Sequence, residues 1–171
     1  MIKVEHISKQ FKKVKAVDDV SLEVKKGEIV CLIGPSGSGK STVLRCIHGL
    51  EVPETGYVYL NGEVLDPKKS NYQELRNKMG FVFQHFNLFP NMTVYDNIAS
   101  PLVARRLDKT IIHDSVIQLM KELHIEGLEK RYPRQLSGGQ KQRVALARLL
   151  IYNAEAILLD EPFSALDEDL K

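Results

Sequence analysis

The sequence predicts an α/β fold with an N-terminal antiparallel β-subdomain and an α-helical subdomain inserted into the α/β core. Two short apolar runs, Ile29–Ile33 and Ala156–Asp160, have the pattern of strands buried on both faces of a parallel sheet. The third of the chain between them, about 85–135, shows helical but no strand periodicity, which favours an inserted helical subdomain. The alternative is one continuous α/β layer with long helices.

The N-terminal part carries the strand signals of an antiparallel sheet. Apolar and polar residues alternate over 20–24, the period of a half-buried strand, and the segment Ile2–Ser8 supplies a second strand. Residues 57–60 and 63–65 flank Asn61-Gly62, a strong signal for a two-residue hairpin turn.

The remaining elements follow from helical spacing and short apolar runs. A helix is expected from Lys40 to about Leu50, and a short strand over 81–83. Apolar residues recur at helical spacing over 110–125, which predicts an amphipathic helix. A further helix is expected from about Gly138 to Tyr152, leading into the second apolar run.

Composition bounds the function classes. The chain has 171 residues, 43% apolar and 27% charged, and its net charge of +2 is too small to indicate nucleic acid as a partner. Cys31 and Cys46 are interpreted as small buried residues in a reducing compartment. The charged N-terminus does not resemble a signal peptide, and no apolar stretch approaches the ~20 residues that cross a bilayer. A cytosolic location is expected, with docking on other subunits if the protein serves a membrane.

A glycine-rich segment matches the pattern G-x-x-x-x-G-K-[ST] and lies between an expected strand and an expected helix. Such a loop points backbone N–H groups at phosphate oxygens, and the helix N-terminus adds a favourable dipole. Lys40 is expected to reach the β- and γ-phosphates and Ser41 to bind Mg²⁺. A chance glycine-rich turn is the alternative. The expected nucleotide-binding residues of this segment are Gly34, Pro35, Ser36, Gly37, Ser38, Gly39, Lys40, Ser41 and Thr42.

An acidic pair, Asp160 and Glu161, ends the second apolar run. Carboxylates beside a phosphate-binding loop suit Mg²⁺ coordination and activation of water. We therefore expect Asp160 to hold the metal and Glu161 to act as general base. A solvated pair of loop carboxylates is the alternative.

A second phosphate-binding device lies about a hundred residues further on, at Leu136–Gln140. Ser137 is a natural helix N-cap, and the two glycines after it allow a phosphate to approach the free backbone amides. One nucleotide site needs only one such loop. Two of them in one chain indicate that two copies pair, each supplying half of a shared pocket.

These motifs together resemble the nucleotide-binding domain of ATP-binding cassette (ABC) transporters, over essentially the whole chain. Gly34–Ser41 is similar to the Walker A loop, Ile157–Asp160 to Walker B, and Leu136–Gln140 to the family signature. Ser164–Asp167 resembles the D-loop, and Gln84 the glutamine of the Q-loop. Phe11 lies where the family places an aromatic ring on adenine; a core position in an edge strand is the alternative.

The resemblance implies a P-loop NTPase (RecA-like) core from residues 1–84 and 153–171, and a mostly helical signature subdomain from 85–152. It also implies a head-to-tail homodimer that binds two ATP molecules with Mg²⁺. Each ATP would lie between the Walker A loop of one copy and Ser137, Gly138, Gly139 and Gln140 of the other. Gln84 would contact Mg²⁺ and act in catalysis with Lys40 and Glu161, and Asp167 would link the two sites.

Within the family, the stretch 83–98 is similar to importers of polar amino acids. This similarity predicts a peripheral ATPase on the cytoplasmic side of the cell membrane, with permease subunits and an extracytoplasmic binding protein as partners. The apolar cluster Phe86, Leu88 and Phe89 is interpreted as an exposed groove for the permease; core packing is the alternative. A soluble cassette of translation or DNA repair, and a fragment that binds without hydrolysing, remain alternative functions.

The chain departs from the family pattern after Glu161. The family places a histidine about thirty residues beyond that glutamate, whereas none of the five histidines here follows Asp160. We therefore expect a C-terminally truncated cassette that hydrolyses ATP weakly and exposes an unpaired sheet edge.

Overall fold

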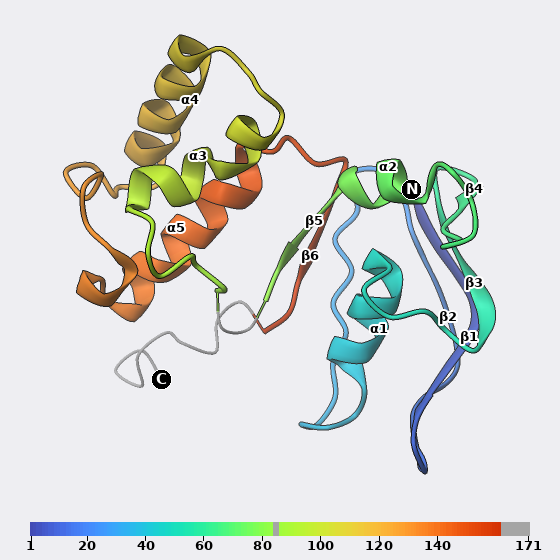
Figure 1. Cartoon of the computed structure of the whole chain (residues 1–171). Coiled ribbons are helices and arrows are strands. Elements are labelled where there is room, and N and C mark those ends of the chain that lie inside the picture. Colours follow the sequence, from blue (N-terminus) through green and yellow to red (C-terminus); the bar gives the residue numbers. More distant parts are fainter. Residues whose placement is uncertain (84–85, 162–171) are drawn as a thin grey trace. The chain divides into compact units, whose positions relative to one another are not determined.

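The computed structural model describes residues 1–83 and 86–161, which divide into two compact units. The first unit comprises Met1–Met79 and Glu155–Asp160. The second comprises Gly80–Ala154, with Glu161 among the described residues. The chain passes from the first unit to the second within β5 (Met79–Val82) and returns just before β6 (Ala156–Leu159) (Figure 1).

The first unit contains the expected antiparallel sheet. Its strands are β1 (Ile2–Phe11), β2 (Val14–Val24), β3 (Thr55–Leu60) and β4 (Glu63–Val64), in the order β2-β1-β3-β4. β1 is central to the pairing, since Ile2 lies opposite both Val24 and Leu60. Six apolar side chains of this sheet are almost completely buried and form its core: Ile2, Val4, Ile7, Val17, Val58 and Leu60.

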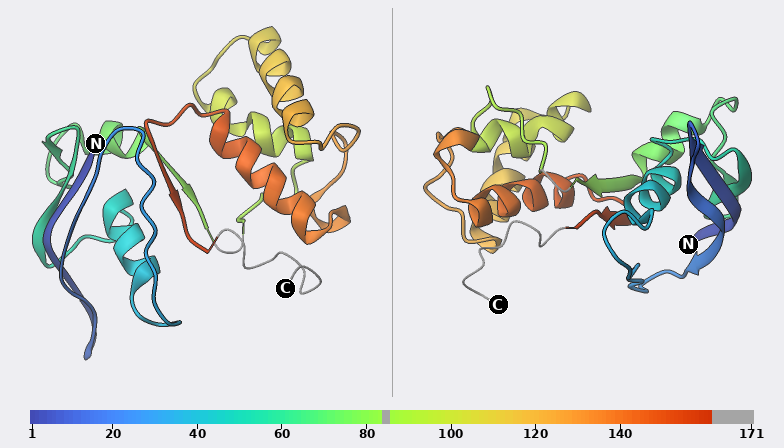
Figure 2. Two further views of the ribbon diagram at one scale, coloured as in Figure 1. Left: turned by 180° about the vertical axis from the view of Figure 1, so that it is seen from behind. Right: turned by 90° about the horizontal axis from the view of Figure 1, so that it is seen from below.

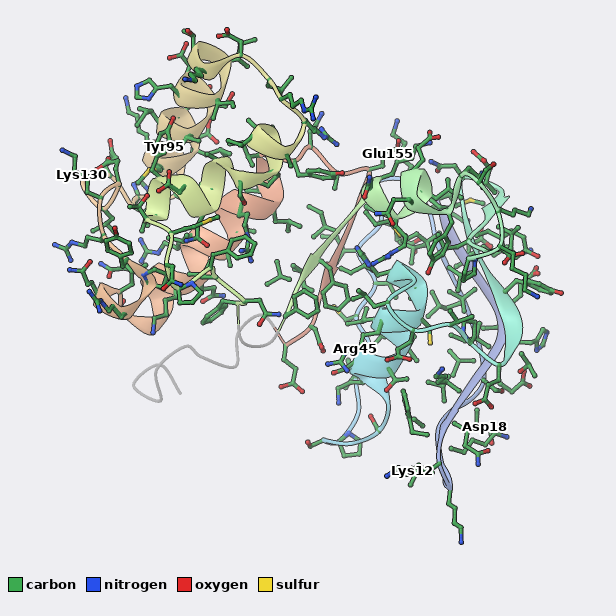
Figure 3. The ribbon with its side chains drawn as sticks, in the orientation of Figure 1. Lys12, Asp18, Arg45, Tyr95, Lys130 and Glu155 are labelled. Carbon is green, nitrogen blue, oxygen red and sulfur yellow. The ribbon has the colours of Figure 1, made fainter. Side chains whose placement is uncertain are left out.

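The hairpin between β3 and β4 turns at Asn61 and Gly62, with φ of 52° and 85°, as the sequence predicts. Two positive φ values in succession produce the twist that joins two antiparallel strands in a two-residue turn. The turn is held at both sides: the N-terminal amino group donates to Asn61 Oδ1 at 2.8 Å, and Asn61 Nδ2 donates to Glu155 Oε2 at 2.6 Å. Glu155, which directly precedes β6, is labelled in Figure 3.

Gly56 shows where the sheet has no room for a side chain. Its φ is +79°, and a Cβ there would overlap the backbone carbonyl oxygens of Glu5 and His6 on β1. We expect Gly56→Ala to lower the free energy of unfolding by about 3 kcal/mol or more, because strain and overlap add. Chemical denaturation measures this loss.

Gly62→Ala is the matched control for that substitution. Gly62 also has a positive φ, +85°, but nothing lies within 4 Å of its added Cβ. It should therefore cost only the backbone strain, about 1–2 kcal/mol. Equal losses for the two variants would contradict the steric explanation.

Helix α1 (Lys40–His48) follows the glycine-rich loop and contacts β2 of the sheet and β6 (Figure 2). It buries Val43, Cys46 and Ile47 and ends at Gly49, which has a left-handed φ of 74°. The short helix α2 (Tyr72–Asn77) holds this end, since Tyr72 Oη donates to Gly49 O at 2.5 Å and Arg76 Nε to His48 O at 3.2 Å. Burial lowers the pKa of His48 to about 4, so the imidazole is neutral at pH 7.

Two strand predictions need correction. Residues 29–33 form no strand, and Ile29 and Ile33 are 90% and 94% exposed; Cys31 is likewise exposed, whereas Cys46 is buried as predicted. In β6, Leu158 is buried while Ile157 and Leu159 are 44% and 41% exposed, so one face is covered rather than two. An apolar run becomes a doubly buried strand only where neighbours pair its edges and cover both faces.

The second unit is mainly helical. Helices α3 (Val94–Ala104), α4 (Lys109–Glu122) and α5 (Gly138–Leu150) pack on one another, and a 3₁₀ turn covers Pro133–Gln135 (Figure 1). The predicted 110–125 helix is thus confirmed as α4, and the predicted Gly138–Tyr152 helix as α5. The shared core contains Val94, Ile98, Leu102, Ile112, Val116, Met120, Ile125, Leu136, Val144 and Ala147. Within the described parts of the chain, no helix is long and apolar enough to span a membrane.

Candidate nucleotide-binding site

The glycine-rich loop is closed by its own lysine. Lys40 Nζ donates to the carbonyl oxygens of Gly34 and Pro35, each at 2.8 Å. Residues 34–38 are exposed, so the loop can be reached by a ligand. The lysine ammonium is therefore held at the loop that surrounds a phosphate in this motif.

Gly39 is required by both conformation and space. It is the N-cap of α1 with a left-handed φ of 92°, and a Cβ would overlap the carbonyl oxygen of Ala16 on β2. The sheet thus presses against the loop at this glycine. The contact with Ala16 has no signal in the local sequence and becomes visible only in the structure.

The N-terminus of α1 is suited to an anion. Among the described residues no side chain caps it, and its first turn carries no acidic residue. The uncapped amides and the helix dipole both favour a negatively charged group, which is the reason that phosphates bind at such ends. Thr42, the third residue of α1, is half-buried.

Ser41 and Asp160 meet although they lie 119 residues apart in the chain. Ser41 Oγ donates to Asp160 Oδ1 at 2.7 Å, and Asp160 is only 3% exposed. One hydroxyl and one carboxylate oxygen side by side fit Mg²⁺, which commonly takes one or two protein oxygens and completes its shell with phosphate and water. The residues that the structure describes contain no group of three or more acidic, His or Cys side chains for a metal.

Glu161 follows Asp160 directly and is exposed, with a left-handed φ of 48°. Its carboxylate is therefore accessible to solvent, as a base acting on water must be. Two other predicted site residues, Gln84 and Asp167, lie outside the described residues.

In the second phosphate-binding device, Leu136–Gln140, helix α5 begins with a complete capping box. Ser137 Oγ accepts from Gln140 N at 3.2 Å, and Gln140 Oε1 accepts from Ser137 N at 3.0 Å. This confirms Ser137 as the N-cap. Ser137 is exposed, Gly138 is half-buried, and a Cβ on Gly139 would meet nothing within 4 Å, so this helix end remains open to an incoming anion. Leu136 anchors the turn in the helical core.

Phe11 ends β1 and is 42% exposed, with Lys9 Nζ 5.3 Å from its ring centre. The alternative of a core position is therefore wrong. An exposed ring at a strand end can stack on a flat ligand, and adenine stacking stays a prediction for this residue.

The apolar cluster Phe86, Leu88 and Phe89 does not form the expected exposed groove. Phe86 is 8% exposed, and Leu88 packs on the helical core; Phe89 alone is well exposed, at 47%. The helical core needs apolar side chains from this segment, and core packing therefore explains two of the three. Sequence reasoning missed two polar residues that hold the segment, Asn97 and Arg148. The signal available in the sequence was an Asn at position 97 among the apolar residues of this helix.

A protein-family model described as "ABC transporter" matches residues 17–164. Among solved structures, the chain is similar to the dimeric ATP-binding cassette MJ0796 in a post-hydrolysis state with ADP and Pi. The TM-score is 0.90 and the identity 37%, and the match covers 99% of this chain and 77% of that one. The predicted α/β cassette fold is thereby confirmed.

Curated relatives resemble the chain over nearly its whole length. It is 51% identical to the sulfate/thiosulfate import ATP-binding protein CysA 1 of Agrobacterium fabrum, and 48% identical to CysA of Thermosynechococcus vestitus, covering 99% of this chain each time. The chain spans about half the length of these relatives, 49% in both cases. The expected similarity to polar amino-acid importers is corrected, because these relatives are named for sulfate and thiosulfate.

Proposed function

The chain belongs to the ABC transporter family, and we propose that it is the ATP-binding and ATP-hydrolysing subunit of a membrane importer. The contact between Ser41 Oγ and Asp160 Oδ1, at 2.7 Å, carries the proposal. It joins the end of the phosphate loop to the carboxylate at the end of β6 within one unit. A magnesium nucleotide needs both groups in one place.

Each residue has a distinct task in the proposed reaction. Lys40 and the amides of the α1 N-terminus bind the β- and γ-phosphates, while Ser41 and Asp160 would hold Mg²⁺, which would offset negative charge on the phosphates. Glu161 accepts a proton from the attacking water. Gln84 would contact Mg²⁺ and pass the state of the γ-phosphate to the permease subunit.

The second phosphate-binding device, Leu136–Gln140, is the reason that we propose a dimer. The related cassette MJ0796 is described as dimeric, and in this proposal two copies pair head to tail. Ser137, Gly138, Gly139 and Gln140 of one copy then cover the ATP bound by the other. Their open helix end supplies backbone N–H groups to the γ-phosphate. Asp167 would connect the two sites.

The proposed cargo is sulfate or thiosulfate, on the strength of the relatives' names. In such an assembly the permease and an extracytoplasmic binding protein contact the cargo, whereas the cassette supplies the energy. The cassette is then a peripheral subunit on the cytoplasmic side of the membrane. Uptake of labelled sulfate and of labelled polar amino acids by cells that carry the protein with its permease distinguishes the two cargo classes.

The metal step can be tested with Asp160→Asn, an almost isosteric change. We expect ATP binding without metal to change little, whereas the Mg²⁺ concentration for half-maximal hydrolysis should rise about tenfold or more as a charged ligand is lost. Fluorescent-nucleotide titration and phosphate release measure the two quantities. Asp114→Asn, on the exposed surface of α4, is the control. An unchanged Mg²⁺ requirement in the Asp160 variant would contradict the assignment.

A further inference from the structure

The segment Phe86–Met92 is neither helix nor strand, yet its backbone is held from two helices. Asn97 of α3, which is fully buried, holds the end of the segment nearest that helix. Its Oδ1 accepts from Phe89 N at 2.8 Å, and its Nδ2 lies 2.9–3.2 Å from the carbonyl oxygens of Phe89, Met92 and Thr93. The end of the segment nearest α3 is thereby closed into a compact turn.

Arg148 of α5 holds the other end. Its Nη1 donates to Asn87 O and its Nη2 to Phe86 O, both at 2.9 Å, and the guanidinium lies 5.4 Å from the centre of the Phe89 ring. Burial lowers the pKa of Arg148 from its ordinary value. The planar guanidinium is thus used as a fork on two successive carbonyl groups, a geometry that lysine cannot reproduce.

The backbone at this fork is unusual for its residues. Phe86 and Asn87 have φ of 58° and 44°, the left-handed region that residues other than glycine rarely adopt. Two such residues in succession persist only where the surroundings impose them. The fork of Arg148 supplies that constraint, because it bonds the carbonyl groups of these same two residues.

We propose that Arg148 is a positioning residue that fixes the Phe86–Phe89 segment to α5, so that the exposed Phe89 side chain moves with that helix. Ser137, the N-cap of α5, is the residue expected to meet the partner's nucleotide. A displacement at the N-terminus of α5 therefore reaches Phe89 through one rigid helix and one guanidinium. The coupling part of this inference, in which Phe89 passes the displacement of α5 to the permease, rests on the proposed function. The positioning of the segment by Arg148 does not.

Arg148→Met is the test variant, and Arg143→Met is its control. Methionine keeps the apolar stem and can still pack on the Phe89 ring, while both donors are removed. Arg143 lies on the same helix and also donates from Nη1 to carbonyl oxygens, but at 3.3 Å and 3.5 Å and to His124 and Leu123 instead. Comparing the two variants distinguishes the effect of losing the hydrogen bonds to Phe86 and Asn87 from the effect of losing a positive charge on α5.

Amide hydrogen exchange on the purified protein tests the positioning directly. We expect Arg148→Met to speed exchange at residues 86–92 by about tenfold or more, because two charge-assisted hydrogen bonds are lost. Exchange in the core of α3 should stay unchanged, and Arg143→Met should leave 86–92 as in the wild type. An unchanged rate at 86–92, or an equal increase through the whole second unit, would overturn the proposal.

ATP turnover in the complex with the permease tests the coupling. Arg148→Met should reduce permease-stimulated turnover by about tenfold, while unstimulated turnover and its KM stay within about twofold of the wild type. Arg148→Lys, with one charged donor group, should fall between. A parallel loss of stimulated and unstimulated turnover would overturn the coupling. A wild-type protein that does not hydrolyse ATP would refute the proposed function alone, and the exchange result would still stand.

Discussion

Glu161→Gln is expected to slow ATP hydrolysis by about 10²–10⁴-fold while ATP still binds, because the amide cannot accept the proton of the attacking water. Glu161 is exposed, whereas the neighbouring Asp160 is buried and its carboxylate accepts a hydrogen bond from Ser41. Because their surroundings differ, we expect the two acids to have different tasks. Phosphate release measures the rate, and titration with a fluorescent ATP analogue measures binding.

The same variant should accumulate as a dimer in the presence of ATP, since the nucleotide that joins the two copies is no longer cleaved. Size-exclusion chromatography with light scattering reads out this change. Glu155→Gln changes an acid that lies directly before β6, and it serves as the control with near-normal turnover. A Glu161 variant that hydrolyses ATP at the wild-type rate would remove Glu161 from the reaction.

Lys40→Ala is expected to weaken ATP binding by about 10²-fold and to abolish measurable turnover, since the loop loses its phosphate-binding cation. The structure adds a second reason for a large effect. Lys40 Nζ bonds the carbonyl oxygens of Gly34 and Pro35, so the substitution also releases the loop from its closed form. Equilibrium binding of ATP and the rate of phosphate release measure the two losses.

Lys130→Ala is the control for Lys40→Ala. Lys130 is an exposed lysine of the second unit (Figure 3). Its removal changes the net charge equally but should leave ATP affinity unchanged. Full binding by the Lys40 variant would show that the amides of the loop and of α1 suffice. The role of the lysine in binding would then be wrong.

The elements predicted most reliably from sequence are those whose cause is local. The turn at Asn61-Gly62 follows from two residues that tolerate positive φ, and it has that form here. Helix α4 follows from its apolar spacing, and the start of α5 from Ser137 with Gln140 three residues on. Each depends on residues within a few positions of one another, so one sequence window contains the necessary information.

The errors lie where distant parts of the chain decide. The run 29–33 reads as a buried strand, yet Ile29 and Ile33 are almost fully exposed, because strand pairing depends on residues far away in sequence. Phe86 reads as an exposed apolar residue, yet it is buried in the second unit. Local hydropathy reports how apolar a segment is and leaves open what covers it.

The sequence by itself determined the family, the phosphate loop and the residue types of the site, because backbone-bound phosphate requires glycines, a lysine and a hydroxyl at fixed spacing. Tertiary structure alone decided three contacts: Ser41 with Asp160, Gly39 against Ala16, and Arg148 on the carbonyl groups of Phe86 and Asn87. Each joins residues more than twenty positions apart. Such contacts exist only after the chain has folded, because the geometry that brings their atoms within bonding distance is a property of packing.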